Sequence, residues 1–194
     1  MISTAKFVDE LQDHGYTHLC VVPCSFAKDI INEVLNRNCI EYTPCASEAV
    51  ACSIAAGLKI GGLKPLVIVQ SSGLTNMGSC ITSLLKPYSI RFPIIVSWRS
   101  YSESESEIQH KHLAENLPNL ISSYGYDYEI LNQESSDIAL KQLEKCNVSD
   151  QICILENETF SKVALLNKHQ LDLEGFLSRS LFLKELNNLF SNQD

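Results

Sequence analysis

Short apolar runs alternate with helical patterns along most of this chain, and this alternation restricts its fold more than any other feature. Strand-like runs are expected at 18–22, 40–43, 65–70, 93–98, 128–131 and 151–156. Helical patterns are expected at 3–14, after Ser25, at 47–57, and at about 74–85, 111–122 and 136–146. Strands this apolar, separated by helices, predict an α/β fold in three layers, with helices on both faces of a mostly parallel sheet.

The chain has 194 residues, of which 45% are hydrophobic, so it can bury one sizeable core. We expect residues 1–160 to form one domain and 161–194 to form a tail, which begins irregularly and becomes an amphipathic helix at 173–190. The net charge of −8 disfavours nucleic acids and membranes as partners, because both require clustered Lys and Arg. With no leader-like N-terminus and no run of ~20 apolar residues, a cytoplasmic location is expected.

Eight cysteines are present, at positions 20, 24, 39, 45, 52, 80, 146 and 153. Several lie inside apolar runs and none forms a CxxC pair, so we expect reduced, mostly buried thiols rather than a disulfide scaffold. Metal-ligand spacing is also absent, because His110 and His112 are two residues apart and would point to different faces of a helix.

Polar residues cluster where the expected strands end, at 23–25, 47–48, 70–73 and 98–100. In a parallel sheet, ligands bind beyond the carboxyl ends of the strands, where loops enter the following helices. We therefore expect these four segments to meet at one rim of the sheet.

One carboxylate opens a helix that otherwise carries no acid. Glu48 is followed by Ala-Val-Ala-Cys-Ser-Ile-Ala-Ala, so few positions around it face water. A carboxylate kept there loses hydration unless it binds something, which makes Glu48 the first candidate for chemistry. The alternative is that Ser47 caps the helix and Glu48 sits hydrated in its first turn, favoured by the helix dipole.

The 70–73 turn offers an amide, two hydroxyls, a flexible glycine and free backbone N–H groups at a helix N-terminus. This combination suits a polar or anionic ligand, although an ordinary capped turn has the same composition. Neither GxGxxG nor GxxxxGK[ST] occurs, so the sequence carries no dinucleotide or P-loop fingerprint.

Two further residues can bind anions. A guanidinium at a strand end, as at Arg99, can clamp a carboxylate, phosphonate or sulfonate, and His110 offers a proton donor or an anion contact. For Arg99 the alternative is a surface ion pair with the Ser-Glu alternation at 102–107, which is expected to be a solvated loop. For His110 the alternative is the start of a surface helix. A hydrolase pairing Cys24 or Cys45 with His110 is disfavoured, because its local signatures are missing.

Six segments occur in a particular order: Val-Pro-Cys-Ser at 22–25, Ser-Glu…Ala-Ala-Gly at 47–57, Gln-Ser-Ser-Gly-Leu-Thr-Asn at 70–76, Thr-Ser-Leu at 82–84, Trp-Arg at 98–99 and Gln-His at 109–110. Together they resemble the N-terminal half of phosphonopyruvate decarboxylase and the alpha subunit of sulfopyruvate decarboxylase, a family of thiamine-diphosphate enzymes. The resemblance covers about residues 4–160. It implies the flavodoxin-like, pyrimidine-binding domain of the cofactor site.

The resemblance carries the family's glutamate onto Glu48. That residue would hydrogen-bond N1′ of the aminopyrimidine and favour the imino tautomer that accepts the proton from thiazolium C2. By the same resemblance, the cofactor would supply the carbon nucleophile that adds to the keto carbon of a 2-oxo acid, carbon dioxide would leave, and protonation would release an aldehyde. The implied catalytic residues are Glu48 and His110; the implied cofactor-binding residues are Glu48, Gln70, Ser72 and Gly73; the implied substrate-binding residues are Cys24, Ser25, Arg99 and His110.

The chain also departs from the family pattern, at Ala49, Ser71, Thr75, Ser100 and Ile108. Two of these departures, Thr75 and Ser100, replace loop glycines and remove backbone freedom. The family's Gly-Asp-Gly motif, which holds Mg²⁺ through oxygen ligands, does not occur. The diphosphate and Mg²⁺ are therefore expected to be bound by a partner, either a beta subunit or a C-terminal domain, and the tail helix would contact that partner.

The expected function is the pyrimidine-binding half of a thiamine-diphosphate-dependent carboxy-lyase. It would convert phosphonopyruvate to phosphonoacetaldehyde and carbon dioxide within a hetero-oligomer or homo-oligomer. Arg99 and His110 lean toward phosphonopyruvate, whereas Cys24 leans toward sulfopyruvate. The alternatives are the alpha subunit of a sulfopyruvate decarboxylase, a decarboxylase for another 2-oxo acid, a non-catalytic assembly subunit of the same fold, and a flavodoxin-like module for another ligand.

Overall fold

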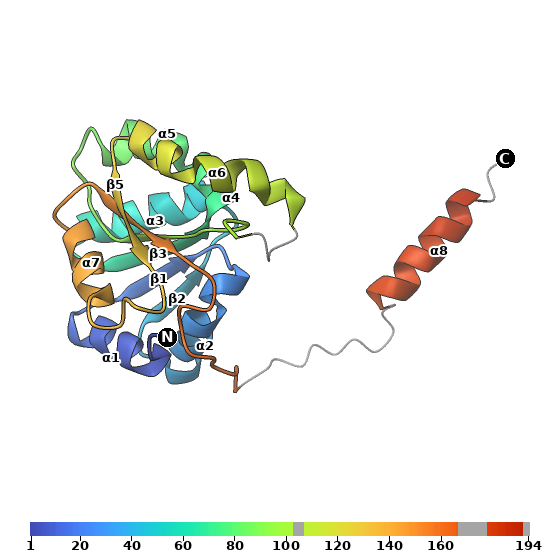
Figure 1. The fold of residues 1–194 in the computed structure, drawn as a ribbon, viewed down its shortest axis with the longest axis horizontal. Helices are drawn as coiled ribbons and strands as arrows, with labels where there is room; N and C mark the ends of the chain where they lie inside the picture. The colour runs from blue at the N-terminus through green and yellow to red at the C-terminus, as the bar shows by residue number, and fades with distance from the viewer. Residues whose placement is uncertain (103–106, 167–177, 192–194) are drawn as a thin grey trace.

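The computed structural model describes residues 1–102, 107–166 and 178–191, and within these ranges six parallel strands form a single sheet (Figure 1). The strand order is β2-β1-β3-β4-β6-β5. The strands are β1 (His18–Val21), β2 (Glu41–Pro44), β3 (Pro65–Gln70), β4 (Ile94–Ser97), β5 (Asp127–Leu131) and β6 (Gln151–Leu155). The mostly parallel sheet predicted from the sequence is confirmed, and each strand begins and ends within one residue of its expected position.

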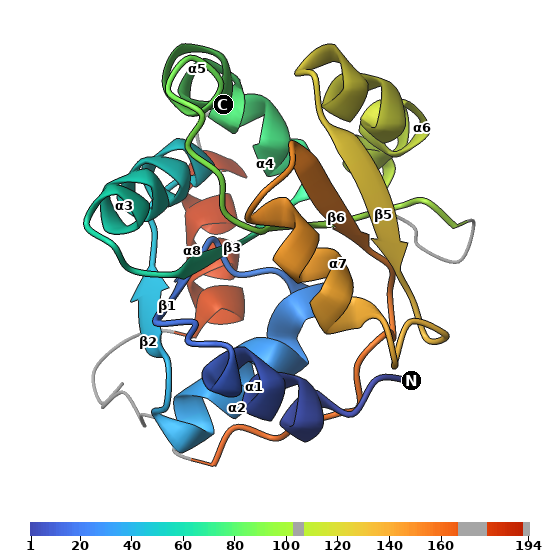
Figure 2. The same ribbon diagram turned by 90° about the vertical axis from the view of Figure 1, so that its left-hand side faces the viewer.

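Helices cover both faces of this sheet (Figure 2). One face packs against α1 (Thr4–Asp13), α2 (Lys28–Arg37) and α7 (Ala139–Cys146). The other packs against α3 (Glu48–Ile60), the helical run 71–85 and α6 (Ile108–Ser123). The predicted three-layer α/β architecture is therefore confirmed.

The central strand β3 is buried on both faces, which explains its run of apolar residues. Leu66 and Ile68 face the core beneath α1, α2 and α7, whereas Val67 and Val69 face the core beneath α3 and α6. All four are at most 1% exposed. Because alternate side chains of a strand point to opposite faces, a strand covered on both faces needs apolar residues at every position.

The helical run after β3 begins earlier than predicted. It consists of α4 (Ser71–Leu74), the 3-10 turn η2 (Thr75–Met77), α5 (Gly78–Cys80) and the π-helical segment η3 (Ile81–Leu85). The sequence places the helix start near residue 74, which is wrong by three residues. Gly73 and Gly78 have low helix propensity and hide the pattern, whereas burial of Leu74 and Met77 stabilises the run.

Two other helices also start away from their predicted positions. Helix α6 begins at Ile108 rather than near 111, so His110 lies in its first turn. Helix α7 begins at Ala139 rather than 136, because the chain first turns at Ser135, whose carbonyl accepts hydrogen bonds from the N–H groups of Ile138 and Ala139. A short 3-10 turn, η1 (Ser25–Ala27), precedes α2.

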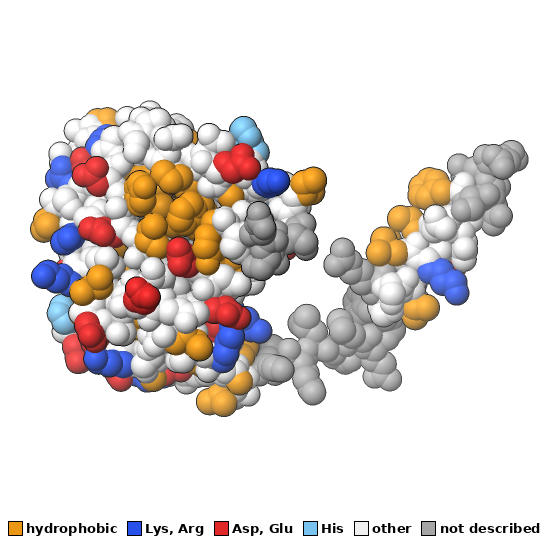
Figure 3. Space-filling view, in the orientation of Figure 1, with side chains coloured by type: hydrophobic (Ala, Val, Ile, Leu, Met, Phe, Trp, Pro, Cys, Tyr) orange, Lys and Arg blue, Asp and Glu red, His pale blue; other side chains and the backbone are white. Residues whose placement is uncertain are grey.

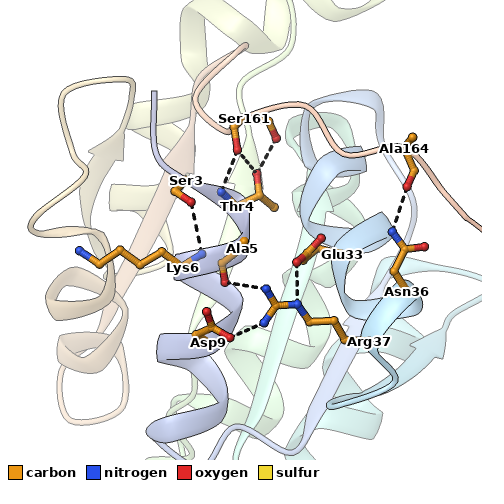
Figure 4. A network of polar contacts seen from close by, with 10 residues as sticks. All are labelled: Ser3, Thr4, Ala5, Lys6, Asp9, Glu33, Asn36, Arg37, Ser161 and Ala164. Atoms are coloured by element: carbon orange, nitrogen blue, oxygen red, sulfur yellow. Dashed lines mark hydrogen bonds and ion pairs between the residues drawn. The ribbon is translucent and has the colours of Figure 1, made fainter.

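After β6 the chain runs irregularly along α1 and α2 (Figure 4). The Thr4 N–H donates to Ser161 Oγ at 3.0 Å, and Asn32 Nδ2 donates to the Val163 carbonyl at 2.7 Å. Ile2 pairs with Phe160 in a parallel bridge. Residues 159–164 are thereby attached to the domain by backbone and side-chain hydrogen bonds.

A final helix, α8 (Arg179–Ser191), agrees with the C-terminal part of the helix predicted at 173–190; residues 173–177 lie outside the described residues. Phe182, Leu186 and Phe190 fall on one side of α8 and are 53%, 38% and 68% exposed. Figure 3 shows hydrophobic side chains along it. Among the described residues, no helix is both long and apolar enough to cross a membrane.

Candidate active site

The carboxyl ends of four strands carry the residues that the sequence singles out. The loop after β1 holds Cys24 and Ser25, the chain after β2 enters α3 at Glu48, and β3 runs directly into α4. Arg99 follows β4, which is in parallel register with β3. These segments follow the carboxyl ends of parallel strands, so they lie at one end of the sheet, as predicted from the sequence.

Glu48 is the first residue of α3 and is only 6% exposed. Its helix starts where expected, because Ser47 adopts an extended conformation and its hydroxyl accepts a hydrogen bond from the Val50 N–H at 3.4 Å. The carboxylate does not face bulk water, however. Asn76 Nδ2 donates to Glu48 Oε2 at 2.9 Å, so a residue of η2 holds one oxygen of this carboxylate.

Gly73 gives the Glu48 carboxylate its space. A Cβ atom built on Gly73 would overlap Oε1, Cδ and Cγ of Glu48. Gly73 itself is buried and has ordinary helical conformation, so its role is the close approach rather than an unusual backbone angle. Glu48 is thus packed between its own helix and the first turns of the run 71–85.

The remaining residues of the 70–73 turn differ in their surroundings. Gln70 is half-buried and is the N-cap of α4, without a side-chain cap bond. Ser71 is fully buried, and its Oγ accepts a hydrogen bond from the Arg99 N–H at 3.4 Å. Ser72 is half-buried, and its carbonyl accepts the Thr75 hydroxyl at 2.8 Å. Helix α4 therefore joins the surroundings of Glu48 to those of Arg99.

Arg99 and His110 meet at a single carboxylate. Arg99 Nη2 lies 2.8 Å from Glu107 Oε2, and His110 Nε2 lies 3.1 Å from the same oxygen. Both residues are 8% exposed, and the guanidinium also lies over the Phe26 ring at 5.1 Å. His110 Nδ1 is buried and has no hydrogen-bond partner among the described residues. The structure thus brings together two anion-binding candidates from different elements. The ion pair between Arg99 and the Ser-Glu alternation, the alternative for Arg99, is present at Glu107, with a buried guanidinium and an exposed carboxylate.

Helix α6 is docked so that this meeting is possible. Trp98 Nε1 donates to the Ala114 carbonyl at 2.9 Å, which connects the end of β4 to the second turn of α6. Ser100 Oγ donates to the Glu107 carbonyl at 3.0 Å. Ser100 has φ +56°, in the left-handed region that glycine adopts without strain. Thr75 has φ −63° and an ordinary helical conformation.

The loop after β1 holds two candidate residues, Cys24 and Ser25, which differ in their exposure. Cys24 is buried, and its Sγ lies 3.0 Å from Ser97 Oγ, which in turn lies 3.4 Å from the Val69 carbonyl. Ser25 is exposed. The sulfur of Cys24 therefore contacts Ser97 of β4, whereas His110 contacts Glu107, and the described contacts give a Cys-His hydrolase no support.

A pair of thiols lies one helical turn beyond Glu48 and Asn76, where α3 packs against α5. A hydrogen bond with Cys52 lowers the pKa of the Cys80 thiol to about 7; burial opposes this shift, and Ser53 Oγ, 3.7 Å from the sulfur, adds to it. The same interaction and burial raise the pKa of Cys52. All eight cysteines are free thiols, and the described residues hold no group of three or more His, Cys, Asp or Glu able to bind a metal.

The sequence alone does not identify two residues of this site. Asn76 lies within the segment 70–76, and its one signal is its place three residues after Gly73, on the same helix face. Glu107 is expected in a solvated loop, because charge alternation does not reveal which of its members meets a buried cation.

Comparison with known proteins places residues 3–120 in the family described as "Thiamine pyrophosphate enzyme, N-terminal TPP binding domain". The chain is 30% identical over 138 residues to the phosphonopyruvate decarboxylase of Streptomyces viridochromogenes, covering 71% of this chain and 35% of that protein. It is 32% identical over 99 residues to the sulfopyruvate decarboxylase subunit alpha of Methanocaldococcus jannaschii, covering 51% of this chain and 59% of that subunit.

The fold also matches solved structures. The benzoylformate decarboxylase of Polynucleobacter necessarius superposes with a TM-score of 0.62 at 14% identity, covering 99% of this chain and 37% of that one. At this identity the match concerns the fold alone. The chain spans about a third of the length of the Streptomyces viridochromogenes relative that it matches.

Proposed function

Because the chain belongs to the family of thiamine pyrophosphate enzyme N-terminal TPP binding domains, we propose that it supplies the pyrimidine-binding half of a thiamine-diphosphate-dependent 2-oxo acid decarboxylase. The observation that carries this proposal is the buried Glu48 carboxylate, packed on Gly73 and held by Asn76 at the carboxyl end of the sheet. In this proposal residues 1–160 form the cofactor-binding domain, and 161–194 lead toward the partner.

The residue types at this place suit a pyrimidine ring. The missing Cβ of Gly73 lets the Glu48 carboxylate pack against α4, and Gln70 and Ser72, shortly before Gly73 in sequence, are neutral and half-buried. Thiamine diphosphate, when bound, supplies a carbon nucleophile and an electron sink at its thiazolium ring. In our proposal Glu48 accepts a hydrogen bond from the ring nitrogen and holds its proton, while Gln70, Ser72 and Gly73 line the ring.

We propose phosphonopyruvate as the substrate, giving phosphonoacetaldehyde and carbon dioxide, with sulfopyruvate as the alternative. Phosphonate and sulfonate are anions that a guanidinium and an imidazole can bind together. Arg99 and His110 already share one carboxylate oxygen, so they are placed to share an oxygen of such a group. Ser25 and Cys24 would border the substrate, because both lie in the loop after β1. The Cys24 sulfur itself contacts Ser97.

A partner is required in this proposal because no Gly-Asp-Gly motif occurs in the chain, and it would hold the diphosphate and Mg²⁺. The surface next to Glu48 is suited to such a partner. Residues 49–58 and 71–85 carry no charge, and Val50 and Ile54 are 42% and 37% exposed. Depletion of charge is typical of the buried centre of protein interfaces.

A non-catalytic assembly subunit is the second candidate, favoured by the left-handed Ser100 beside the anion-binding pair. The test measures carbon dioxide release from phosphonopyruvate, and in parallel from sulfopyruvate, by this chain with its diphosphate-binding partner, thiamine diphosphate and Mg²⁺. We expect turnover that needs both polypeptides and falls about 10²- to 10⁴-fold in Glu48→Gln. A stable complex without turnover on either substrate would instead support the assembly role.

A further inference from the structure

We propose that Asn76 is a positioning residue for Glu48: its amide holds Oε2 and, with Gly73 packed against Oε1, fixes the orientation of the carboxylate toward the cofactor ring. This inference rests on the proposed function. It names a residue that acts through Glu48 and does not itself touch the ligand.

The contact geometry supports this role. Asn76 Nδ2 lies 2.9 Å from Oε2, a distance expected for a charge-assisted hydrogen bond. Oε1 packs against Gly73, at the place where that residue lacks a Cβ. The terminal torsion of a glutamate is broad, so a carboxylate without a fixed partner can rotate. One hydrogen bond on Oε2 and one close surface at Gly73 together define its plane.

The backbone explains why both contacts come from one short segment. Gly73 and Asn76 are three residues apart in a helical run, so they share one face, and that face packs on the start of α3. Asn76 is itself exposed, whereas Glu48 is buried. The amide therefore reaches inward from the surface to the carboxylate.

The chemistry favours asparagine at this position. Its amide is a neutral donor, so it fixes the carboxylate without cancelling its charge as a lysine would. An aspartate would remove the donor and place a like charge beside Glu48. Alanine would remove the donor and leave Gly73 as the remaining restraint.

The first measurement is a double-mutant cycle on the chain alone, in which unfolding is followed for wild type, Asn76→Ala, Glu48→Ala and the double variant. We expect the two changes to be coupled by roughly tenfold in the unfolding equilibrium constant, equal to about 1.4 kcal/mol. Asn116→Ala is the matched control, because Asn116 is a half-buried asparagine whose side-chain amide donates to the His112 carbonyl within α6 rather than to a carboxylate. Additive effects of Asn76 and Glu48 would overturn the positioning contact, whatever the chain binds.

The second measurement uses the complex with the diphosphate-binding partner, thiamine diphosphate and Mg²⁺. It compares the dissociation constant of thiamine diphosphate with the rate of hydrogen–deuterium exchange at its C2 atom. We expect Asn76→Ala to slow exchange at least tenfold with less than about a threefold change in affinity, since a misplaced group costs rate more than binding. Asn76→Asp should be slower still, whereas Asn116→Ala and Asn116→Asp should match wild type.

The possible failures are distinguishable. Coupled unfolding with an unchanged exchange rate in Asn76→Ala would overturn the positioning role and leave Asn76 a structural residue. A wild-type complex that does not accelerate exchange over free thiamine diphosphate would overturn the proposed function, and with it the role of Asn76 in orienting Glu48 toward a cofactor.

Discussion

Two buried charged groups at the same rim are enclosed in opposite ways. Among the described residues, Glu48 meets a neutral amide and a glycine, neither of which carries a compensating charge. Arg99 meets Glu107, a carboxylate of its own chain, and His110 contacts the same oxygen. In the proposed function, therefore, Glu48 would bind a ligand without losing an ionic partner, whereas Arg99 and His110 would exchange one anion for another.

Exposure indicates which member of the second group gives way. The Glu107 side chain is 45% exposed, while those of Arg99 and His110 are each 10% exposed. The side chains of Arg99 and His110 are enclosed by the fold and the carboxylate reaches them from outside. In the proposed function, an anionic substrate would therefore compete with Glu107 rather than displace a buried residue.

The largest effect should come from filling the space beside Glu48. Gly73→Ala forces a Cβ into the carboxylate, and we expect a loss of about 1–3 kcal/mol of unfolding free energy together with loss of turnover. Gly57→Ala is the matched control, because a Cβ there meets nothing within 4 Å in an exposed helix position. It should stabilise the protein by roughly 0.5–1 kcal/mol in the same denaturation experiment. Equal effects of the two alanines would show that Gly73 and Glu48 do not touch in solution.

A smaller effect is expected at the second group. Glu107→Gln removes the internal anion, so the KM for phosphonopyruvate should fall by up to about tenfold, with a weaker dependence on salt. Glu115→Gln, on an exposed position of the same helix, removes one negative charge without touching Arg99 and should leave the KM nearly unchanged. A higher KM in Glu107→Gln would mean that Glu107 orients Arg99 and His110 for the substrate instead of competing with it.

The smallest effects on stability are expected from the backbone next to each of the two groups. Ser100 adjoins Arg99 in a left-handed conformation, so Ser100→Gly should raise the unfolding free energy by about 1 kcal/mol. Thr75 adjoins Asn76 in a helical conformation, so Thr75→Gly should lower it by roughly 0.5–1 kcal/mol. Both positions replace a glycine of the family pattern. Thermal unfolding of the two variants checks this. If both substitutions changed the stability in the same direction, the assignment of strain to Ser100 and not to Thr75 would be contradicted.

The sequence predicted the sheet well because both faces of each central strand are covered. Successive apolar residues such as Val67 and Ile68 indicate a strand that is buried on both faces, so the strand positions follow directly from the sequence. Helix starts were harder, since Gly73 weakens the helical pattern at the place where the site needs close approach. Glu48 could be predicted because it is a single acidic residue at the start of a run of small residues. Asn76 could not be assigned, because its hydrogen bond reaches a residue 28 positions away along the chain.

The pairing of Ile2 with Phe160 brings the two ends of the α/β unit side by side, with the Ile2 N–H donating to the Thr159 carbonyl and the Ser161 N–H donating to the Ile2 carbonyl. A unit whose ends meet can be inserted into a longer polypeptide, or separated from one, without breaking its sheet. The relatives include a protein named as a subunit alpha and a decarboxylase about three times as long as the matched region. In this fold, fusion or fission of genes would change the covalent connections at the ends of the unit and leave its geometry intact.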